Sequence, residues 1–318
     1  MSELDTRVVQ LSDMRSLGEL ARARGEERPG EGALEALERA PRHDEAYFRD
    51  RRGFDEAFLR DFPVPLPRCV GRTAGDEAPL KSGTGHVLRY NNFSVVMSAS
   101  RRIALYTACN IDGQASKKIK RDSDAWFYDD RIDRAHQTGD ELYRDNELDR
   151  GHLVRREDPV WGAFATLAND DTFHFTNCSP QHSGMNQKTW LGLEDYILGN
   201  ARVHNLRMCV FTGPVLRADD MDYRGVKLPK EYWKVVAFRT DDRPSATAYM
   251  VSQGKLIADL EFVFGRYKTY QVAIAEIEAL AGLDFGELSR FDGLSSEAVP
   301  DGRQWRREEL PSWEAIRV

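Results

Sequence analysis

Two consecutive apolar, β-branched segments constrain the fold of this chain more than any other feature of its sequence. They span residues 86–98 and 101–111 and are joined by Ala99-Ser100, so they predict a β-hairpin. Further strands are expected at residues 208–212, 233–238 and 246–252, and helices at 186–198 and 270–281. Strands and helices mix without the regular alternation of a parallel sheet. This favours an α+β fold with a mainly antiparallel central sheet flanked by helices.

Composition divides the 318 residues into three regions. Residues 1–85 are rich in Arg, Glu, Gly and Pro and contain a Phe-rich patch, so we expect an extension that packs on or regulates something else. Residues 86–285 carry the strand and helix patterns of a folded domain. Residues 286–318 form a loop-rich tail, which we expect to pack on that domain through Trp305 and Trp313.

The overall charge limits the classes of function that this chain can serve. A net charge of -7 argues against a protein whose main task is to coat nucleic acid with a basic face. Hydrophobic residues make up 41% of the chain and charged residues 31%, which excludes a wholly disordered polypeptide. Any contact with nucleic acid must therefore depend on a few locally placed cations and should be sensitive to salt.

The expected cellular location of the protein and the redox state of its cysteines follow from signals that the sequence lacks. No secretory signal is visible, and no stretch approaches the roughly 18 to 20 apolar residues that cross a bilayer. We therefore expect a cytoplasmic protein with no membrane partner, while export by a route without a signal peptide stays open. The four cysteines show no zinc-binding spacing, and buried thiols in a reducing compartment are favoured over disulfides.

The segment Asp149-Arg150-Gly151-His152 carries the side chains best suited to phosphate chemistry. Histidine is the side chain most able to take a proton near neutral pH, which makes His152 a candidate general base. Arg150 offers a forked, permanent positive charge that matches a phosphate. Gly151 permits a sharp backbone or the close approach of a ligand.

The helix expected from Asn186 adds a second set of polar residues. Asn186, Trp190 and Glu194 follow an i, i+4, i+8 series and share one helix face. Asn186 and Glu194 would be about 12 Å apart along the axis, too far to bind one ion directly. An ion held by the Asn186 amide oxygen, with Glu194 reaching its waters, is compatible, and magnesium suits such a site.

Each of these residues also has a structural interpretation. Asn186 is favoured as a helix cap, and Trp190 is expected in the core and not as a base-stacking platform. His174 alternates with phenylalanines and is expected to be a hydrogen-bonded strand residue. His182 follows Pro180-Gln181 and is left outside the catalytic set.

Taken together, residues 86–285 resemble the DNA/RNA non-specific endonucleases, the ββα-metal family that includes endonuclease G. The Asp149-to-Leu153 segment carries the resemblance together with the Asn186, Trp190, Leu193 and Glu194 series. Four further segments occur in the order and at the spacing of the family: Asp171-Thr172-Phe173, Asn177 with Pro180-Gln181, Phe211-Thr212-Gly213-Pro214 and residues 229–236. The resemblance implies a ββα-metal nuclease fold.

The resemblance also implies a role for each matching residue. His152 corresponds to the general base that deprotonates the attacking water, and Asn186 to the single direct protein ligand of Mg²⁺, for which Mn²⁺ is a plausible substitute. Glu194 corresponds to the carboxylate that anchors the water shell of the metal. Arg150 corresponds to an arginine close to the phosphate, Asn177 to an asparagine that supports this geometry, and Asp149 to a supporting group.

The sequence departs from the family at one position. The family commonly carries a further phosphate-binding arginine upstream, just before an aromatic residue, and Asp124 stands near that position here. Four arginines are candidates to replace it: Arg121, Arg131, Arg155 and Arg156. Arg155 and Arg156 lie three and four positions after His152, and we include both among the expected substrate-binding residues.

The expected function is therefore Mg²⁺-dependent, non-specific cleavage of DNA and RNA that leaves 5′-phosphate and 3′-hydroxyl ends. Two alternatives stay open: a catalytically weakened descendant that binds nucleic acid or protein, and a phosphodiesterase of small nucleotides. A nuclease needs restraint in its own cell, so a regulatory or immunity partner is expected to act through residues 1–85. The resemblance also makes a homodimer plausible.

Overall fold

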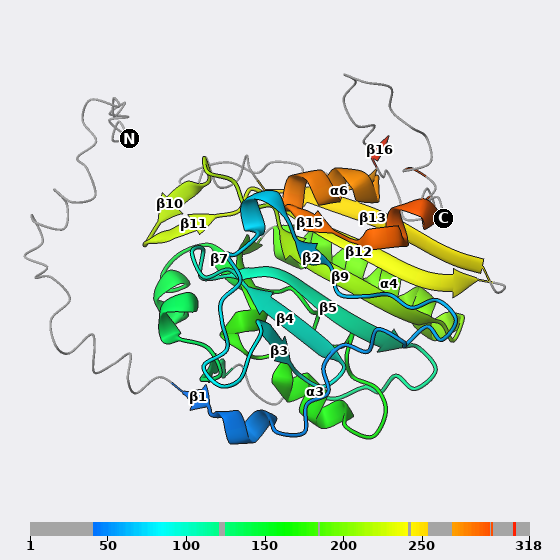
Figure 1. The fold of residues 1–318 in the computed structure, drawn as a ribbon, viewed down its shortest axis with the longest axis horizontal. Helices are drawn as coiled ribbons and strands as arrows, with labels where there is room; N and C mark the ends of the chain where they lie inside the picture. Colours follow the sequence, from blue (N-terminus) through cyan, green and yellow to red (C-terminus); the bar gives the residue numbers. More distant parts are fainter. Residues whose placement is uncertain are drawn as a thin grey trace, which may run out of the picture. The chain divides into compact units, whose positions relative to one another are not determined.

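The structure is built on a sheet in which every neighbouring pair of strands is antiparallel (Figure 1). The computed structural model describes residues 41–120, 125–183, 185–240, 243–253, 269–292, 294 and 308–309. Within these residues the sheet has eight strands, in the order β16 (Glu308–Glu309), β14 (Thr269–Val272), β13 (Arg243–Ser252), β12 (Glu231–Thr240), β9 (Arg207–Pro214), β5 (Ala104–Asp112), β4 (Phe93–Met97) and β3 (Val87–Arg89).

Shorter elements surround this sheet. Four two-stranded pairs join β7 (Leu148–His152) to β8 (Cys178–His182), β10 (Met221–Tyr223) to β11 (Val226–Leu228), β1 (Arg42–His43) to β6 (Tyr128–Asp129), and β15 (Leu283–Asp284) to β2 (Arg68–Cys69). The α-helices are α3 (Ala165–Asp171), α4 (Leu191–Val203) and α6 (Ile274–Ala281), and a π-helical turn, η7 (Met185–Trp190), precedes α4. The 3-10 turns are η2 (Glu45–Phe48), η3 (Gly71–Thr73), η4 (Arg134–His136), η5 (Asp140–Leu142), η6 (Phe175–Asn177) and η8 (Gly286–Phe291).

The central strands bury both of their faces. In β9, Met208 and Val210 join one buried cluster while Cys209 and Phe211 join another, as expected for side chains that alternate across a sheet. The first cluster contains residues of α4, and we call it the α4-side core. The second contains residues of α6, and we call it the α6-side core. The two helices therefore cover opposite faces of the sheet (Figure 1).

Residues 42–85 contribute to both cores. Phe48 is buried in the α4-side core, and Phe54, Phe58 and Phe62 are buried in the α6-side core. The Phe-rich patch of the expected extension therefore packs on the central sheet, in the same compact unit as the rest of Arg42–Val318. Residues 1–40 lie outside the described residues. In the C-terminal tail, Leu288 reaches the α6-side core, whereas Trp305 and Trp313 lie outside the described residues.

The structure confirms strands at the predicted segments 101–111, 208–212, 233–238 and 246–252. The segment 86–98, predicted as one strand, forms two strands, β3 and β4, which pair with each other. One predicted helix is also corrected. The helix expected over residues 270–281 begins only at Ile274, because residues 269–272 form strand β14. Tyr270 and Gln271 pair with Met250 and Tyr249 at the edge of the sheet. The sheet offers these residues a continuous hydrogen-bonding partner, and this tertiary pairing overrides the local helical pattern.

All four cysteines are free; Cys109, Cys178 and Cys209 are buried, and Cys69 is partly buried. No helix in the described part of the chain is long and apolar enough to span a membrane.

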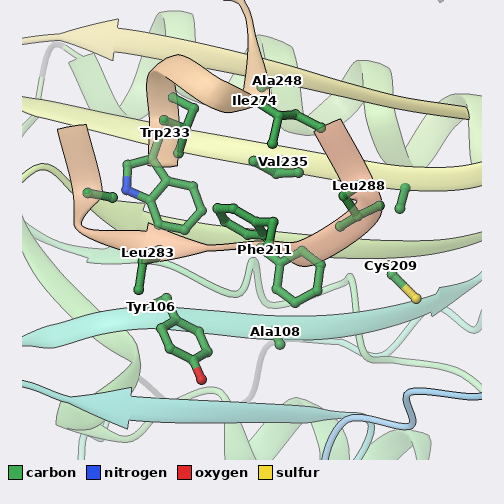
Figure 2. Close-up of a cluster of buried hydrophobic side chains, with 14 of the residues drawn as sticks. Tyr106, Ala108, Cys209, Phe211, Trp233, Val235, Ala248, Ile274, Leu283 and Leu288 are labelled. Carbon is green, nitrogen blue, oxygen red and sulfur yellow. The ribbon is translucent and has the colours of Figure 1, made fainter. Parts of the chain in front are cut away.

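Phe211 lies at the centre of the α6-side core, where its ring packs 5.3 Å from that of Phe54 and 5.5 Å from that of Phe285. Figure 2 shows this core, in which Phe211, Trp233 and Val235 of the sheet lie among Ile274, Leu283 and Leu288. We predict that Phe211→Ala lowers the free energy of unfolding by about 3 to 5 kcal/mol, because it leaves a cavity in a packed core. Denaturant unfolding measures this change. Phe164→Ala is the matched control, since Phe164 is 62% exposed and should change stability by less than about 0.5 kcal/mol.

Candidate active site

Strands β7 and β8 bring the Asp149-to-His152 segment beside a distant part of the chain. Their antiparallel register places His152 opposite Cys178 and Asp149 opposite Gln181. After β8 the chain enters the π-helical turn η7, which carries Asn186, and then α4. Two strands, the π-helical turn and α4 thus form one local unit that contains Asp149, Arg150, His152, Asn186 and Glu194. Asn177 immediately precedes β8, and Arg155 and Arg156 follow β7.

Glycine is the only residue type that fits at position 151 in β7. A Cβ atom built on Gly151 would lie 2.1 Å from Oε1 of Gln181, which is fully buried across the strand pair. The absence of a side chain at Gly151 therefore leaves room for the side chain of Gln181 on the same face of the strand pair. Close packing against Gln181, and not an unusual backbone angle, explains the requirement.

His152 lies at the end of β7 against two aromatic rings. Its imidazole is 4.7 Å from the ring of Trp126 and meets the edge of Phe173 at 5.3 Å, measured between ring centroids. The side chain is partly exposed. Aromatic packing on two sides limits the rotation of the imidazole.

Asn177 holds the backbone that follows His152. Its carbonyl oxygen accepts a hydrogen bond from the Leu153 amide at 2.9 Å, and its side-chain Oδ1 accepts one from the Val154 amide at 2.9 Å. Its Nδ2 donates to the carbonyls of Val154 and Thr172, both at 3.0 Å. Asn177 is fully buried, and three of its hydrogen bonds hold Leu153 and Val154, the residues that follow His152.

Asn186 is oriented by Asp149. The Nδ2 atom of Asn186 donates a hydrogen bond of 3.0 Å to Oδ2 of Asp149, in the strand that ends at His152. Because the amide nitrogen is engaged, the amide oxygen is the atom of Asn186 that can serve as a metal ligand. This contact also ties the turn before α4 to β7.

The carboxylate of Glu194 is buried beside a lysine that we did not identify from the sequence. Oε1 of Glu194 lies 3.1 Å from Nζ of Lys234, and the two side chains are 7% and 1% exposed. Burial raises the pKa of Glu194, while the nearby charges of Lys234 and Arg155 act in the opposite direction. Lys234 belongs to the stretch of residues 229–236 that carries part of the family resemblance, and its charge interrupts an apolar strand. A charged residue within an otherwise apolar predicted strand is the sequence signal that could have identified Lys234.

Asp158 is a second buried carboxyl group in the same region. Burial raises the pKa of Asp158 to about 7, although Lys234 and Arg155 act to lower it. Asp158 is only 5% exposed. The region around Glu194 therefore holds two buried carboxyl groups and two cations, and the sequence pattern gave no indication of Asp158.

The expected phosphate-binding arginines all contact protein groups in the structure. Arg150 forms an ion pair with Asp140, its Nε lying 2.9 Å from Oδ1, and about a third of its side chain is exposed. Arg155 pairs with Asp195 at 2.6 Å and is mostly buried. Arg156 donates to the Ile119 carbonyl and to Asn169, and it pairs with Glu157.

Among the other candidate arginines, Arg131 has a structural role. It pairs with Asp129 at 2.6 Å, and its guanidinium lies 3.6 Å from the centroid of the Phe48 ring. Arg121 and Asp124 lie outside the described residues. Arg150 is therefore the most exposed of Arg131, Arg150, Arg155 and Arg156.

The structural interpretations of the flanking residues can now be compared with the structure. His174 is fully buried and hydrogen-bonded to His43 and to the Asp171 carbonyl, as predicted, but it is the N-cap residue of the 3-10 turn η6 and does not lie in a strand. Trp190 is fully buried, which confirms its predicted place in the core. His182 contacts Glu147 at 3.0 Å. Asn186 is not a helix cap, because it lies inside the π-helical turn and the regular α-helix begins only at Leu191. The wider turn breaks the simple i, i+4, i+8 series that the sequence suggested.

The sequence also matches a described family over most of its length. The family model named DNA/RNA non-specific endonuclease matches residues 75–290, which include the whole β7–β8–α4 unit. The chain belongs to this family. The expected family and the expected α+β fold are both confirmed, and the family consists of nucleases, which are hydrolases.

The similar proteins include an uncharacterized protein and an endonuclease. The uncharacterized protein y4fB of Sinorhizobium fredii is 42% identical over 279 residues, which cover 80% of this chain and 42% of that protein. Mitochondrial endonuclease G of Bos taurus is 28% identical over 204 residues, covering 56% of this chain and 67% of the relative. The chain thus spans less than half the length of the rhizobial relative.

A solved structure supports the fold independently. The crystal structure of the EndoG/EndoGI complex, described as showing the mechanism of EndoG inhibition, aligns with a TM-score of 0.51 and 19% sequence identity. The alignment covers 64% of this chain and 86% of the other. At this level of identity the likeness concerns the fold of the family.

Gly151→Ala tests the packing of the strand pair. The added methyl group would overlap Gln181, so we predict a loss of about 1 to 3 kcal/mol of unfolding free energy from overpacking. Gly199→Ala is the control: it lies in α4, its Cβ would meet no atom within 4 Å, and alanine should stabilise the helix by up to about 1 kcal/mol. Equal stability of the two variants in urea unfolding would contradict the packing argument.

Asp158 should make stability depend on pH. Its pKa is about 7 in the folded protein and about 4 in an unfolded chain, so between these values the folded state binds more protons. Stability should therefore fall as the pH rises from about 4 to about 7, by roughly 1.4 kcal/mol per unit of pKa difference. Asp158→Asn should remove this contribution to the fall of the melting temperature with rising pH, measured in EDTA. Asp222→Asn, at a carboxylate whose side chain is 72% exposed, is the control; an unchanged slope in Asp158→Asn would refute the assignment.

Proposed function

We propose that this protein is a metal-dependent endonuclease that hydrolyses phosphodiester bonds of DNA and RNA with little sequence preference. The β7–β8–α4 unit is the observation that carries the proposal. It joins His152, the Asn186–Asp149 contact and Glu194 in one local arrangement. Family membership supports the same reaction class.

In this proposal His152 is the general base. A water that attacks the phosphorus atom must lose a proton, and a neutral imidazole can accept it near neutral pH. Trp126 and Phe173 fix the ring, while Asn177 fixes the backbone next to it. Arg150 is close in the chain and partly exposed, so it can exchange Asp140 for a phosphate oxygen. Arg155 and Arg156 remain proposed substrate contacts, although each would have to leave its present partner.

The donor atoms at this site fit a magnesium ion. The amide oxygen of Asn186 would bind the ion directly, and the Glu194 carboxylate would hold its water shell. Both are hard oxygen donors, which Mg²⁺ and Mn²⁺ prefer. Within the described residues there is no cluster of three or more His, Cys, Asp or Glu side chains that could hold a metal. When bound, the ion supplies positive charge that stabilises the anionic transition state at phosphorus.

Several finer predictions accompany this function. Cleavage is proposed to leave 5′-phosphate and 3′-hydroxyl ends. The regulatory or immunity partner of residues 1–85, the homodimer and the cytoplasmic location stay predictions. In the solved EndoG/EndoGI complex EndoG is inhibited by a partner, and this supports a partner for the present chain by analogy alone.

A cleavage assay tests the function. Plasmid DNA, single-stranded RNA and a small phosphodiester are each incubated with the protein in Mg²⁺ or EDTA. We expect both polymers to be cut in Mg²⁺ only. His152→Ala should reduce the rate by about 10² to 10⁴, because a positioned general base contributes that much. His204→Ala is the control, since His204 is exposed at the end of α4.

Each alternative gives a different result in this assay. Tight binding of polymer without cleavage would indicate a catalytically weakened descendant. Cleavage of the small phosphodiester alone would indicate a phosphodiesterase of small nucleotides. A folded His152→Ala protein that cuts at the wild-type rate would refute the role of His152.

A further inference from the structure

A buried lysine lies on the α4 side of the central sheet. Lys234 is in the middle of β12, and its side chain is 1% exposed. Its neighbours on the same face of the strand, Tyr232 and Val236, belong to the α4-side core. Removing an ammonium group from water is costly unless it is paired and hydrogen-bonded, so a lysine at this position requires compensating contacts.

Three oxygen atoms surround the Lys234 ammonium. Nζ lies 3.0 Å from Oγ1 of Thr212, 3.4 Å from the carbonyl oxygen of Leu153 and 3.1 Å from Oε1 of Glu194. Nζ donates hydrogen bonds to Thr212 and to the Leu153 carbonyl, and it forms an ion pair with Glu194, so all three contacts are with oxygen atoms. The ammonium also lies 4.7 Å from the centroid of the Trp190 ring. Its position is therefore fixed from several directions.

These contacts come from separate elements of the site. Thr212 is the direct cross-strand neighbour of Lys234 in β9, so it belongs to the rigid sheet. Leu153 immediately follows His152, whereas Glu194 is in the first turn of α4. One ammonium group thus joins the sheet to the segment that carries the proposed base and to the helix that carries the proposed metal-site carboxylate.

We propose that Lys234 is a positioning residue that fixes the Glu194 carboxylate relative to His152 and so prepares the site to bind its metal ion. This role rests on the proposed function, because it assumes that Glu194 holds the water shell of the ion. Lys234 itself touches neither substrate nor metal in this scheme. It acts through Glu194 and through the Leu153 backbone.

The charges around this contact favour the same role. Arg155 is the other cation that acts on Glu194, and its guanidinium is paired with Asp195 at 2.6 Å. Without Lys234, the buried Glu194 would lose its closest positive charge and share its surroundings with Asp158. A carboxylate in that environment would turn toward water or toward Arg155, and its geometry at the metal site would change.

Metal binding by the protein alone tests this role. Binding of Mn²⁺ is measured by the loss of the electron paramagnetic resonance signal of the free ion, and near-ultraviolet circular dichroism verifies the fold. Lys234→Met should weaken Mn²⁺ binding by about 10- to 100-fold, the usual effect of losing a group that orients a ligand. Lys230→Met is the matched control, because Lys230 immediately precedes β12 and its side chain is 35% exposed. The control should bind Mn²⁺ as the wild type does.

A double-mutant cycle distinguishes positioning from a general structural effect. If Lys234 acts through Glu194, the double variant Lys234→Met/Glu194→Gln should bind Mn²⁺ less than about 3-fold more weakly than Glu194→Gln alone. Fully additive losses would overturn the proposal. If Lys234→Met does not fold, Lys234→Arg replaces it. Arg keeps the charge but cannot place its planar donors on the same three acceptors, so binding should fall by at least about 3-fold.

The outcomes separate this proposal from the proposed function. If the wild-type protein binds Mn²⁺ and cuts nucleic acid while folded Lys234 variants do both equally well, only the role of Lys234 fails. If the wild-type protein neither binds Mn²⁺ nor cuts nucleic acid, the proposed function fails and the role of Lys234 fails with it.

Discussion

The antiparallel pairing of β5, β9, β12 and β13 is the constraint on which the rest of this structure depends. Side chains on these strands alternate between two faces, and nearly all of those in β9 and β12 are buried. Each face must therefore be covered by other parts of the chain. Helix α4 covers one face, and α6 covers the other together with residues around Phe54, Phe58 and Phe62. The candidate site develops only on the α4 side, where Lys234 and Thr212 replace apolar side chains.

The polar groups of the site are held by the protein itself. The side chain of Asn177 makes three hydrogen bonds to backbone groups, and Asn186 is oriented by Asp149. Such preorganisation has a physical advantage. Groups already fixed in a poorly hydrated site need little rearrangement when charge develops on a phosphate. The buried pair of Glu194 and Lys234 follows the same principle, since the attraction between the two charges offsets part of the cost of their desolvation.

Much of the fold and the core of the site could be predicted from the sequence, whereas details that depend on distant partners could not. The strands were readable because alternating and β-branched patterns are local. The start of α6 was misjudged because the pairing of Tyr270 with Met250 crosses to another strand. The π-helical turn around Asn186 was likewise missed, because prediction from the local sequence pattern assumes the regular period of an α-helix. The partners of Arg155 and Arg156 were not predictable, because an arginine beside His152 in sequence can still point toward Asp195 or Ile119.

The sequence by itself determined the family, the α+β class and the identity of His152, Asn186 and Glu194 as the residues to examine. These depend on residue types at fixed spacings, which a linear chain displays directly. Only the tertiary structure decided that Gly151 makes room for Gln181 and that Lys234 joins Glu194 to the segment after His152. The physical reason is that both are contacts between strands or helices far apart in the chain. The role of a buried charged side chain depends on the groups that surround it, and these groups come together only when the sheet forms.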